Sequence, residues 1–304
     1  IGCFLRISEC SGISISNVDA DGNNTQIDYG GYWGDVGRQC LHVGIFVQNS
    51  DNIKVAAVRM HHFGLDGLEL LSTNTTPGNI TITNSQFDYN LRNGCSWIGG
   101  KGVIMRNCKF NMNGLGANAS NPRAGLDIEP EVAECENGLF EKCTFDDNGA
   151  AGLISDFHGK FVRNLRFDQC TFTGSTSCAL FPNTGGIRIE NSTIIGQLTS
   201  PAGLSATHKT FFDHCTFYDF NPVNQKKAYF ATILIDAGGH QSCYEISHST
   251  FELKYAKLCY LESGSKDETM MPVFKNNTVN FNGETYVNGD FIALFRGCIL
   301  KDNT

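Results

Sequence analysis

Short segments of this chain alternate apolar and polar residues with a period of two. Residues 80–87 (ITITNSQF) and 103–110 (VIMRNCKF) share one pattern: two alternating apolar positions, then Asn, a Ser or Cys, one variable residue and a final apolar residue. Successive side chains of a strand point to opposite faces, so a period of two predicts strands rather than helices. The recurring Asn and the small residue after it predict a tight turn between two strands.

The final apolar residue of this pattern, called the anchor below, recurs along the whole chain. Anchors stand mostly 21–28 residues apart, with a few longer gaps that indicate insertions. A repeat of this length with a strand pattern predicts an all-β fold, a right-handed single-stranded parallel β-helix of about 11 coils. The anchors are Ala20, Met60, Phe87, Phe110, Phe145, Phe172, Ile194, Phe217, Phe251, Val279 and Leu300.

A second strand is expected in each coil. A glycine follows several anchors by seven residues and opens the segments 68–71, 95–98 and 153–156, and Gly125 opens 126–129 in the same way. In later coils the segments 180–183, 204–207, 233–236 and 259–262 are expected to align with these. We interpret residues 1–304 as one β-helix domain. The first residue is not Met and the apolar alternation begins at once, so we expect a piece of a longer polypeptide.

The small residues of the repeat predict ladders inside the turns. Cys108, Cys143, Cys170 and Cys215 each stand two residues before an anchor, where other coils have Ser. Buried free thiols are the favoured interpretation, because the chain of 304 residues has ample apolar residues and no CxxC pair. The preceding Asn residues are interpreted as structural. The segment 19–23 (DADGN) begins like a calcium loop but lacks the distal Glu, so a turn is expected there.

Composition and charge exclude several classes of function. Apolar residues make up 41% and charged residues 18% of the chain, which is unlike a disordered chain or a coiled coil. The net charge is −8 and no basic block occurs, so nucleic acid is not an expected partner. No apolar run reaches the length of a membrane span, and residues 1–14 lack the features of a signal peptide.

Candidate chemistry lies on the outward face of the second strand. The fourth residues of its segments form a column that reads Leu71, Ile98, Glu129, Asp156, Asn183, Thr207, Asp236 and Glu262. Asp127 stands two residues before Glu129 on the same face. Carboxylates on neighbouring coils lie about 5 Å apart at the backbone, and two such groups tend to keep one proton between them. Glycoside hydrolysis needs such a pair, so Asp127, Glu129 and Asp156 are the candidate catalytic residues, although solvated surface carboxylates have the same pattern.

Residues around this column are candidates for binding a sugar chain. The insertion 111–124 is expected to overhang the face and form one cleft wall. The aromatic loop 29–35 offers a platform for sugars, or packs onto the end of the rod. Trp97 alternates inward and is expected in the core, while His61 and His62 are expected in a turn. The candidate substrate-binding residues are Glu69, Trp33, Arg123, Glu131, His158 and Asp236.

Four segments carry a resemblance to a known superfamily. They are 19–23 (DADGN), 32–38 (YWGDVGR), 63–67 (FGLDG) and 124–131 (AGLDIEPE), supported by the repeated Cys-Thr-Phe turns. The chain resembles the pectate-lyase-like β-helix proteins, and in detail the bacteriophage tailspike depolymerases. That resemblance implies a homotrimer in a virion or outside the cell that binds and cleaves a bacterial capsular polysaccharide, exopolysaccharide or O-antigen, usually by hydrolysis and sometimes by β-elimination.

The sequence therefore predicts an endo-acting glycoside hydrolase that needs no metal or other cofactor. A polysaccharide lyase is the second interpretation, and it would need a base and neutralisation of a uronate, often by calcium. A third is a glycan-binding or adhesin rod without catalysis, in which the carboxylates only hydrogen-bond sugar hydroxyls. No nucleic acid partner and no membrane insertion are expected.

Overall fold

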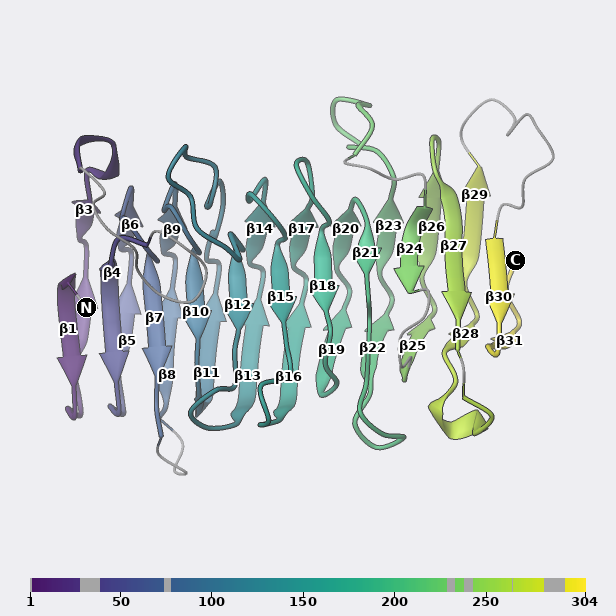
Figure 1. The fold of residues 1–304 in the computed structure, drawn as a ribbon, viewed down its shortest axis with the longest axis horizontal. Helices are drawn as coiled ribbons and strands as arrows, with labels where there is room; N and C mark the ends of the chain where they lie inside the picture. Colours follow the sequence, from purple (N-terminus) through teal and green to yellow (C-terminus); the bar gives the residue numbers. More distant parts are fainter. Residues whose placement is uncertain are drawn as a thin grey trace.

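The computed structural model is an elongated stack of coils with the two termini at opposite ends (Figure 1). It describes residues 2–27, 39–73, 78–228, 233–237, 243–263, 265–281 and 293–304. The whole aromatic loop 29–35, including Trp33, lies outside the described residues.

Each coil contributes one strand to each of up to three parallel sheets. Sheet 1 contains, in spatial order, β1 Gly2–Ser8, β4 His42–Gln48, β7 Leu68–Leu71, β10 Cys95–Trp97, β12 Leu126–Ile128, β15 Leu153–Ser155, β18 Leu180–Pro182, β21 Leu198–Thr199, β24 Ile233–Ala237, β27 Lys257–Glu262 and β30 Ala293–Arg296.

Sheet 2 has the same number of strands, contributed in the same order by the same coils. Its strands are β2 Ser14–Ser16, β5 Lys54–Ala56, β8 Ile80–Thr83, β11 Gly100–Arg106, β13 Cys135–Glu141, β16 Val162–Asp168, β19 Ile187–Glu190, β22 Thr210–Asp213, β25 Tyr244–Ser247, β28 Val273–Lys275 and β31 Ile299–Lys301.

Sheet 3 is shorter and is joined across one coil by single bridges through Lys109. Its strands are β3 Asp19–Asp21, β6 Arg59–His61, β9 Gln86–Asp88, β14 Thr144–Asp146, β17 Thr171–Thr173, β20 Thr193–Ile195, β23 Thr216–Tyr218, β26 Thr250–Leu253 and β29 Thr278–Phe281. The described residues also form two short 3-10 helices, η1 Asn24–Gln26 and η2 Glu268–Met270. No helix among the described residues is long and apolar enough to cross a membrane. The predicted all-β parallel β-helix is confirmed.

Most of the anchors lie where the repeat placed them, on the strands of sheet 3. Phe145 pairs in register with Phe172, and the same column continues through Ile194, Phe217 and Phe251. Neighbouring rings stack almost parallel: Phe110 and Phe145 have centroids 5.1 Å apart, and Phe145 and Phe172 have centroids 4.9 Å apart. Because each ring packs between those of the coils before and after it, the core is continuous along the rod.

The turns between sheets 2 and 3 also follow the prediction. Cys108, Cys143, Cys170 and Cys215 are buried free thiols, and each directs its sulfur at the carbonyl oxygen two residues earlier. Ser192 does the same with its hydroxyl, which confirms that Ser and Cys share one ladder. The residue before this Ser or Cys, an Asn in several coils, adopts the left-handed backbone conformation, with φ of 52° at Asn84 and 53° at Asn107. Asn tolerates this conformation better than most residues, which accounts for its recurrence.

Two of the strand alignments predicted for the C-terminal half of the chain are wrong. Residues 204–207 form a turn instead of a strand, and the strand of that coil is β21. Leu198 of β21 pairs with Ile235, so the segment 233–236 is displaced by two residues from the expected register and Asp236 pairs with Thr199. A displacement of two keeps every side chain on its face, so the apolar alternation could not detect it. Leu300 lies in sheet 2 opposite Phe274 and is not an anchor.

Candidate active site

Three polar side chains occupy one outward column of sheet 1. Glu69 of β7, Ser96 of β10 and Asp127 of β12 are successive partners in the parallel register. All three point out of the solenoid, yet only 4% of Glu69 and 1% of Asp127 are exposed. The sequence predicted this column but not its burial, which arises because the turns that lead from sheet 3 into sheet 1 cover it.

Those turns are held by a ladder of buried asparagines that sequence reasoning missed. The side-chain oxygen of Asn113 accepts hydrogen bonds from the backbone and side-chain amides of Asn90, each 3.0 Å long. Asn148 accepts the same pair from Asn113 one coil further along. Each side-chain amide thus satisfies backbone hydrogen-bonding groups of a turn that have no partner in a sheet. These bonds fix the turn after Asn90, which carries Arg92 and Asn93.

Arg92 is the cation around which the carboxylates gather. Its Nη1 lies 3.1 Å from Asp66, and its Nη2 lies 3.3 Å from Glu129 and 3.8 Å from Asp127. Asp66 and Arg92 were not among the predicted site residues. Each lies one or two residues before a glycine that opens a strand, Gly67 and Gly94, and this position is the signal that could have found them.

A second set of hydrogen bonds fixes the buried acids. Asp66 accepts from the Ser96 hydroxyl at 2.7 Å and from the Asn93 backbone amide at 2.9 Å. The side-chain amide of Asn93 donates to Asp127 at 3.1 Å and to Ser96 at 3.0 Å. Asp66 and Asp127 are therefore held in fixed orientations, as preorganised sites require.

The network holds more acids than one cation can balance. Burial raises the pKa of Glu69 to about 8, and the negative charge of Asp66 adds to that effect. Burial, followed by the charge of Glu129, also raises the pKa of Asp127 well above its ordinary value. Burial alone would lower the pKa of Arg92, but the charges of Asp66, Glu129 and Asp127 outweigh it and raise that pKa. Both shifts favour the protonated forms of Glu69 and Asp127.

Glu129 and Asp156 form the solvent-facing edge of the cluster. The side chain of Glu129 is 17% exposed, and Asp156 is partly exposed on the neighbouring coil. The register of β12 and β15 places their backbones side by side, and the Asp156 amide donates to the carbonyl of Ile128 at 3.3 Å. Asp156 also accepts a hydrogen bond from the side-chain amide of Asn183 at 3.3 Å. The backbones of Glu129 and Asp156 are therefore neighbours on adjacent coils, as the predicted column requires.

Two further predicted residues converge on Glu129. Glu129, Glu131 and His158 form a group in which each residue offers one carboxylate oxygen or imidazole nitrogen. These three atoms lie within 4.8 Å of one another. The Glu131 amide donates to the carbonyl of Glu129 at 2.7 Å, so the chain bends back here after β12. Carboxylate and imidazole groups at this spacing could hold a cation. Beside them Phe157 exposes 47% of its surface and adds an aromatic face to the edge.

The insertion 111–124 packs against the turn that carries Arg92. The Arg92 Nε donates to the carbonyl oxygen of Asn121 at 3.1 Å, and the Ala124 amide donates to the side-chain oxygen of Asn93 at 2.7 Å. The insertion therefore stands beside the cluster, as a cleft wall would. Arg123 packs against Gly114 instead of reaching the carboxylates.

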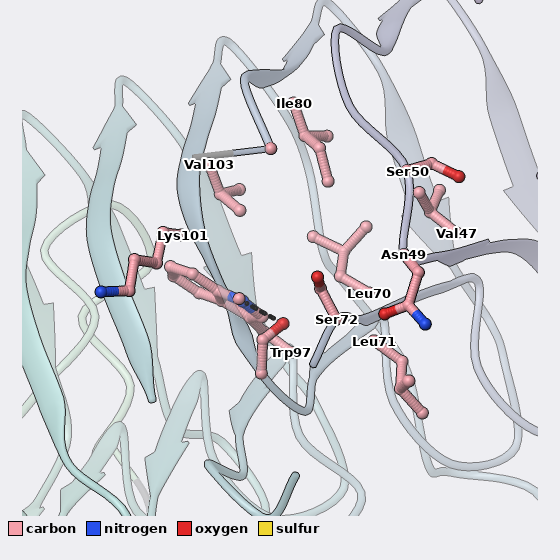
Figure 2. Close-up of a pocket in the computed structure, with 13 residues that line it drawn as sticks. Val47, Asn49, Ser50, Leu70, Leu71, Ser72, Ile80, Trp97, Lys101 and Val103 are labelled. Atoms are coloured by element: carbon pink, nitrogen blue, oxygen red, sulfur yellow. Dashed lines mark hydrogen bonds between the residues drawn. The ribbon is translucent and has the colours of Figure 1, made fainter. Parts of the chain in front are cut away.

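Asp236 lies several coils along the rod from the cluster, as the predicted column implies, but the displaced register of β24 pairs it with Thr199 and moves it out of that column. It stands on β24, which follows β12 in sheet 1 only after β15, β18 and β21, or roughly 19 Å along the rod at the usual strand spacing. Trp97 is confirmed as core. Figure 2 shows it lining a small pocket at the bend from sheet 1 to sheet 2, where its indole N–H donates to the carbonyl of Gly99. Aliphatic side chains dominate that pocket, so it offers little chemistry.

Comparison with known proteins agrees with this architecture. The model of the family described as "Right handed beta helix region" matches residues 4–194. The Agl-KA catalytic domain superposes with a TM-score of 0.50 and 15% identity over 86% of this chain, which spans 52% of that domain. The A-module of the mannuronan C-5 epimerase AlgE4 of Azotobacter vinelandii has a TM-score of 0.47 and 14% identity, covering 93% of this chain and 74% of that module.

No curated protein sequence matches the chain. The family model covers more than half of the residues, and the stacked parallel strands agree with its description. The chain belongs to the right-handed β-helix family.

Proposed function

We propose that this protein cleaves a polysaccharide within the chain, as a glycoside hydrolase, at the edge formed by Glu129 and Asp156. The observation that carries the proposal is the cluster itself: Asp66, Glu69, Asp127 and Glu129 surround the single cation Arg92. Structural ion pairs on the other sheets match one arginine with one or two acids. Four acids around one partly buried arginine cost stability, and such costs are concentrated at functional sites.

The two exposed acids would contact the sugar. Glu129 is paired with Arg92 and supplies a carboxylate that acts as base or nucleophile. Asp156 stands on the next coil and supplies the second carboxyl group. Asp127 and Glu69 lie beneath them, and their protonation sets the charge that Glu129 and Arg92 experience. Phe157 provides an apolar face on which a sugar ring can stack.

The resemblance to tailspikes extends this proposal to the biological setting. The substrate would be a bacterial capsular polysaccharide, an exopolysaccharide or an O-antigen, and the working form a homotrimer carried by a virion or found outside the cell. An extended sheet face suits a long, regular polymer, because successive coils offer equivalent positions about 4.8 Å apart.

One observation favours β-elimination as a second candidate. The convergent group of Glu129, Glu131 and His158 could hold a cation, which would neutralise a uronate carboxylate beside the acids. A lyase would then use a basic group of the same edge to remove the proton next to that carboxylate.

Amide substitutions test the site, because they keep the size of each acid and remove its charge. In Glu129→Gln and Asp156→Asn, cleavage of a responsive bacterial polysaccharide should fall by roughly 10²–10⁴-fold while glycan binding is retained. Asp127→Asn should have a smaller effect, because Asp127 is buried behind Glu129. Glu141→Gln is the matched control: Glu141 also pairs with an arginine, Arg106 at 2.7 Å, but on sheet 2.

The products separate the candidates. New reducing ends without an unsaturated product indicate hydrolysis, and absorbance near 235 nm indicates β-elimination. Binding without turnover in the parent protein, weakened by the same substitutions, indicates an adhesin. If Glu129→Gln and Asp156→Asn cleave as fast as the Glu141→Gln control, the proposed site is wrong.

A further inference from the structure

A group of two imidazoles and two carboxylates lies on sheet 3, apart from the candidate active site. Asp19 and Asp21 belong to β3, and His61 ends β6 on the next coil. Asp21 and His61 are direct partners in the parallel register, so their side chains leave the same face of the sheet on neighbouring strands. The β-helix register itself brings this acid and this imidazole together.

The backbone turns His62 toward the same point. Consecutive residues of a strand face opposite sides, but His62 has a φ of 55°, in the left-handed region. Its Nδ1 consequently lies only 2.7 Å from the Nδ1 of His61. One carboxylate oxygen of Asp21 lies 3.9 Å from the first of these nitrogens and 4.0 Å from the second.

The three ligand atoms leave room for one ion between them. At 3.9 and 4.0 Å the Asp21 oxygen is too far from either nitrogen for a hydrogen bond. The point equidistant from the three atoms lies roughly 2.1 Å from each, which equals a zinc–nitrogen or zinc–oxygen bond. A tetrahedral ion separates its ligands by roughly 3.4 Å, so small rotations that part the two nitrogens and draw Asp21 closer complete the geometry.

The surrounding contacts fix the imidazoles as a metal site requires. The Nε2 of His61 lies 3.0 Å from a carboxylate oxygen of Asp19. That bond places the proton of His61 on Nε2 and leaves Nδ1 free to coordinate, the arrangement of carboxylate–histidine–zinc triads. The ring of His62 stacks on Tyr89, with centroids 5.2 Å apart and an interplanar angle of 6°.

A second histidine group shows how an ordinary hydrogen-bonded cluster differs. His248 and His214 each direct Nδ1 at an oxygen of Asp213, at 2.8 and 3.1 Å, so both nitrogens are within hydrogen-bonding distance of the carboxylate, and the two rings stack with centroids 5.0 Å apart. In the group on β3 and β6 the two nitrogens face each other and the carboxylate stands back. Two opposed imidazole nitrogens hydrogen-bond only if one carries the proton, whereas both can bind one cation.

We propose that Asp21, His61 and His62 bind a zinc ion, with Asp19 orienting His61. Nitrogen donors favour zinc over calcium, and a His₂-carboxylate set leaves the fourth position to water or to a ligand from solution. Asp21 is exposed, so its carboxylate is accessible to an ion from solution. The ion would link the first coil to the second at the N-terminal end of the described rod.

Calorimetric titration of the full chain with zinc chloride, after chelator treatment and dialysis, tests the proposal. The parent protein should bind one equivalent that the variants of the Asp21, His61 and His62 group lose and that the control variant keeps. His62→Asn should lose this binding by more than about 100-fold, while its backbone is preserved, because Asn tolerates the left-handed conformation. Asp21→Asn should also weaken it, and Asp19→Asn should lower the affinity roughly 10–100-fold through the orientation of His61. The matched control is His248→Asn, which removes another turn histidine with positive φ, 47°.

Thermal unfolding gives a readout independent of the titration. Zinc should raise the unfolding temperature of the parent protein and of His248→Asn, but not that of His62→Asn, because only a folded site binds the ion. Cobalt bound in place of zinc should show the intense visible bands of a tetrahedral site. Absence of saturable zinc binding would show that the pair is a hydrogen bond alone, and binding that survives both His62→Asn and Asp21→Asn would overturn the assigned ligands.

Discussion

At the scale of single residues, the most informative feature is an acid buried at an outward position. Glu69 leaves the sheet on the solvent side, yet only 4% of it is exposed. Burial raises its pKa to about 8, so the folded protein keeps Glu69 protonated in a pH range where the unfolded chain would release that proton. The site therefore links the state of one proton to the stability of the fold.

The raised pKa of Glu69 makes the folded protein less stable as the pH rises. The stabilisation from protonated Glu69 is fully present below about pH 4.5, the ordinary value, and is lost as pH rises toward about 8. The free energy of unfolding should fall across this range by an amount on the order of a few kcal/mol. In Glu69→Gln, a neutral mimic of the protonated acid, the decline should be clearly flatter.

Urea unfolding of both proteins between pH 5 and pH 8 measures this difference. Glu141→Gln controls for the removal of a carboxylate from an ion pair elsewhere. Parallel pH profiles for the parent and Glu69→Gln would show that Glu69 does not hold the proton in the folded protein.

At the scale of elements, the stacked rings of sheet 3 connect the coils. Phe145 lies between Phe110 and Phe172 and also meets the edge of Phe167 at 6.2 Å. All four are buried. A defect in this stack therefore affects three coils at once, among them those that carry Glu129 and Asp156.

Phe145→Ala should destabilise the protein by about 3–5 kcal/mol, because the cavity lies where neighbouring rings cannot collapse. Chemical unfolding measures it. Phe157→Ala removes the same ring from an exposed position and should change stability little, while weakening glycan binding. Equal loss of stability in the two variants would contradict the importance of the stack.

The sequence predicted the elements better than their exact alignment. The anchors from Met60 to Val279 were correct because a buried, repeated position tolerates few residue types. The alignment of β24 was wrong by two residues because insertions on both sides removed the spacing signal, and the alternation repeats every two residues.

The candidate site was predicted in part for a similar reason. Glu69, Asp127, Glu129 and Asp156 lie on strands, whose faces follow from the alternation. Asp66 and Arg92 lie in turns, and no periodic pattern tells where a turn residue points. The burial of Asp127 was missed because it depends on Asn93, which reaches it across 34 residues of sequence.

At the scale of the whole molecule, the rod separates its sites along its length. The group on β3 and β6 belongs to the first two coils, whereas the carboxylate cluster spans β7, β10 and β12 with Asp156 following β15 (Figure 1). Described strands pair only with strands of neighbouring coils. Changes in one site should therefore reach the other only through the coils between them.

This nearest-neighbour pairing has a mechanical consequence. A force applied to the two chain ends along the rod loads the hydrogen bonds of one terminal coil at a time, so the strands should peel away in sequence. A coil such as that from Leu126 to Leu153 holds 27 residues and would add roughly 90 Å of extended chain. Stretching single molecules between optical tweezers should give a series of small, similar steps, and one large step would show that the coils rupture together. A glycan bound across several coils would make those coils rupture together in one larger step. The position of that step in the recording would therefore show where along the rod the polymer binds.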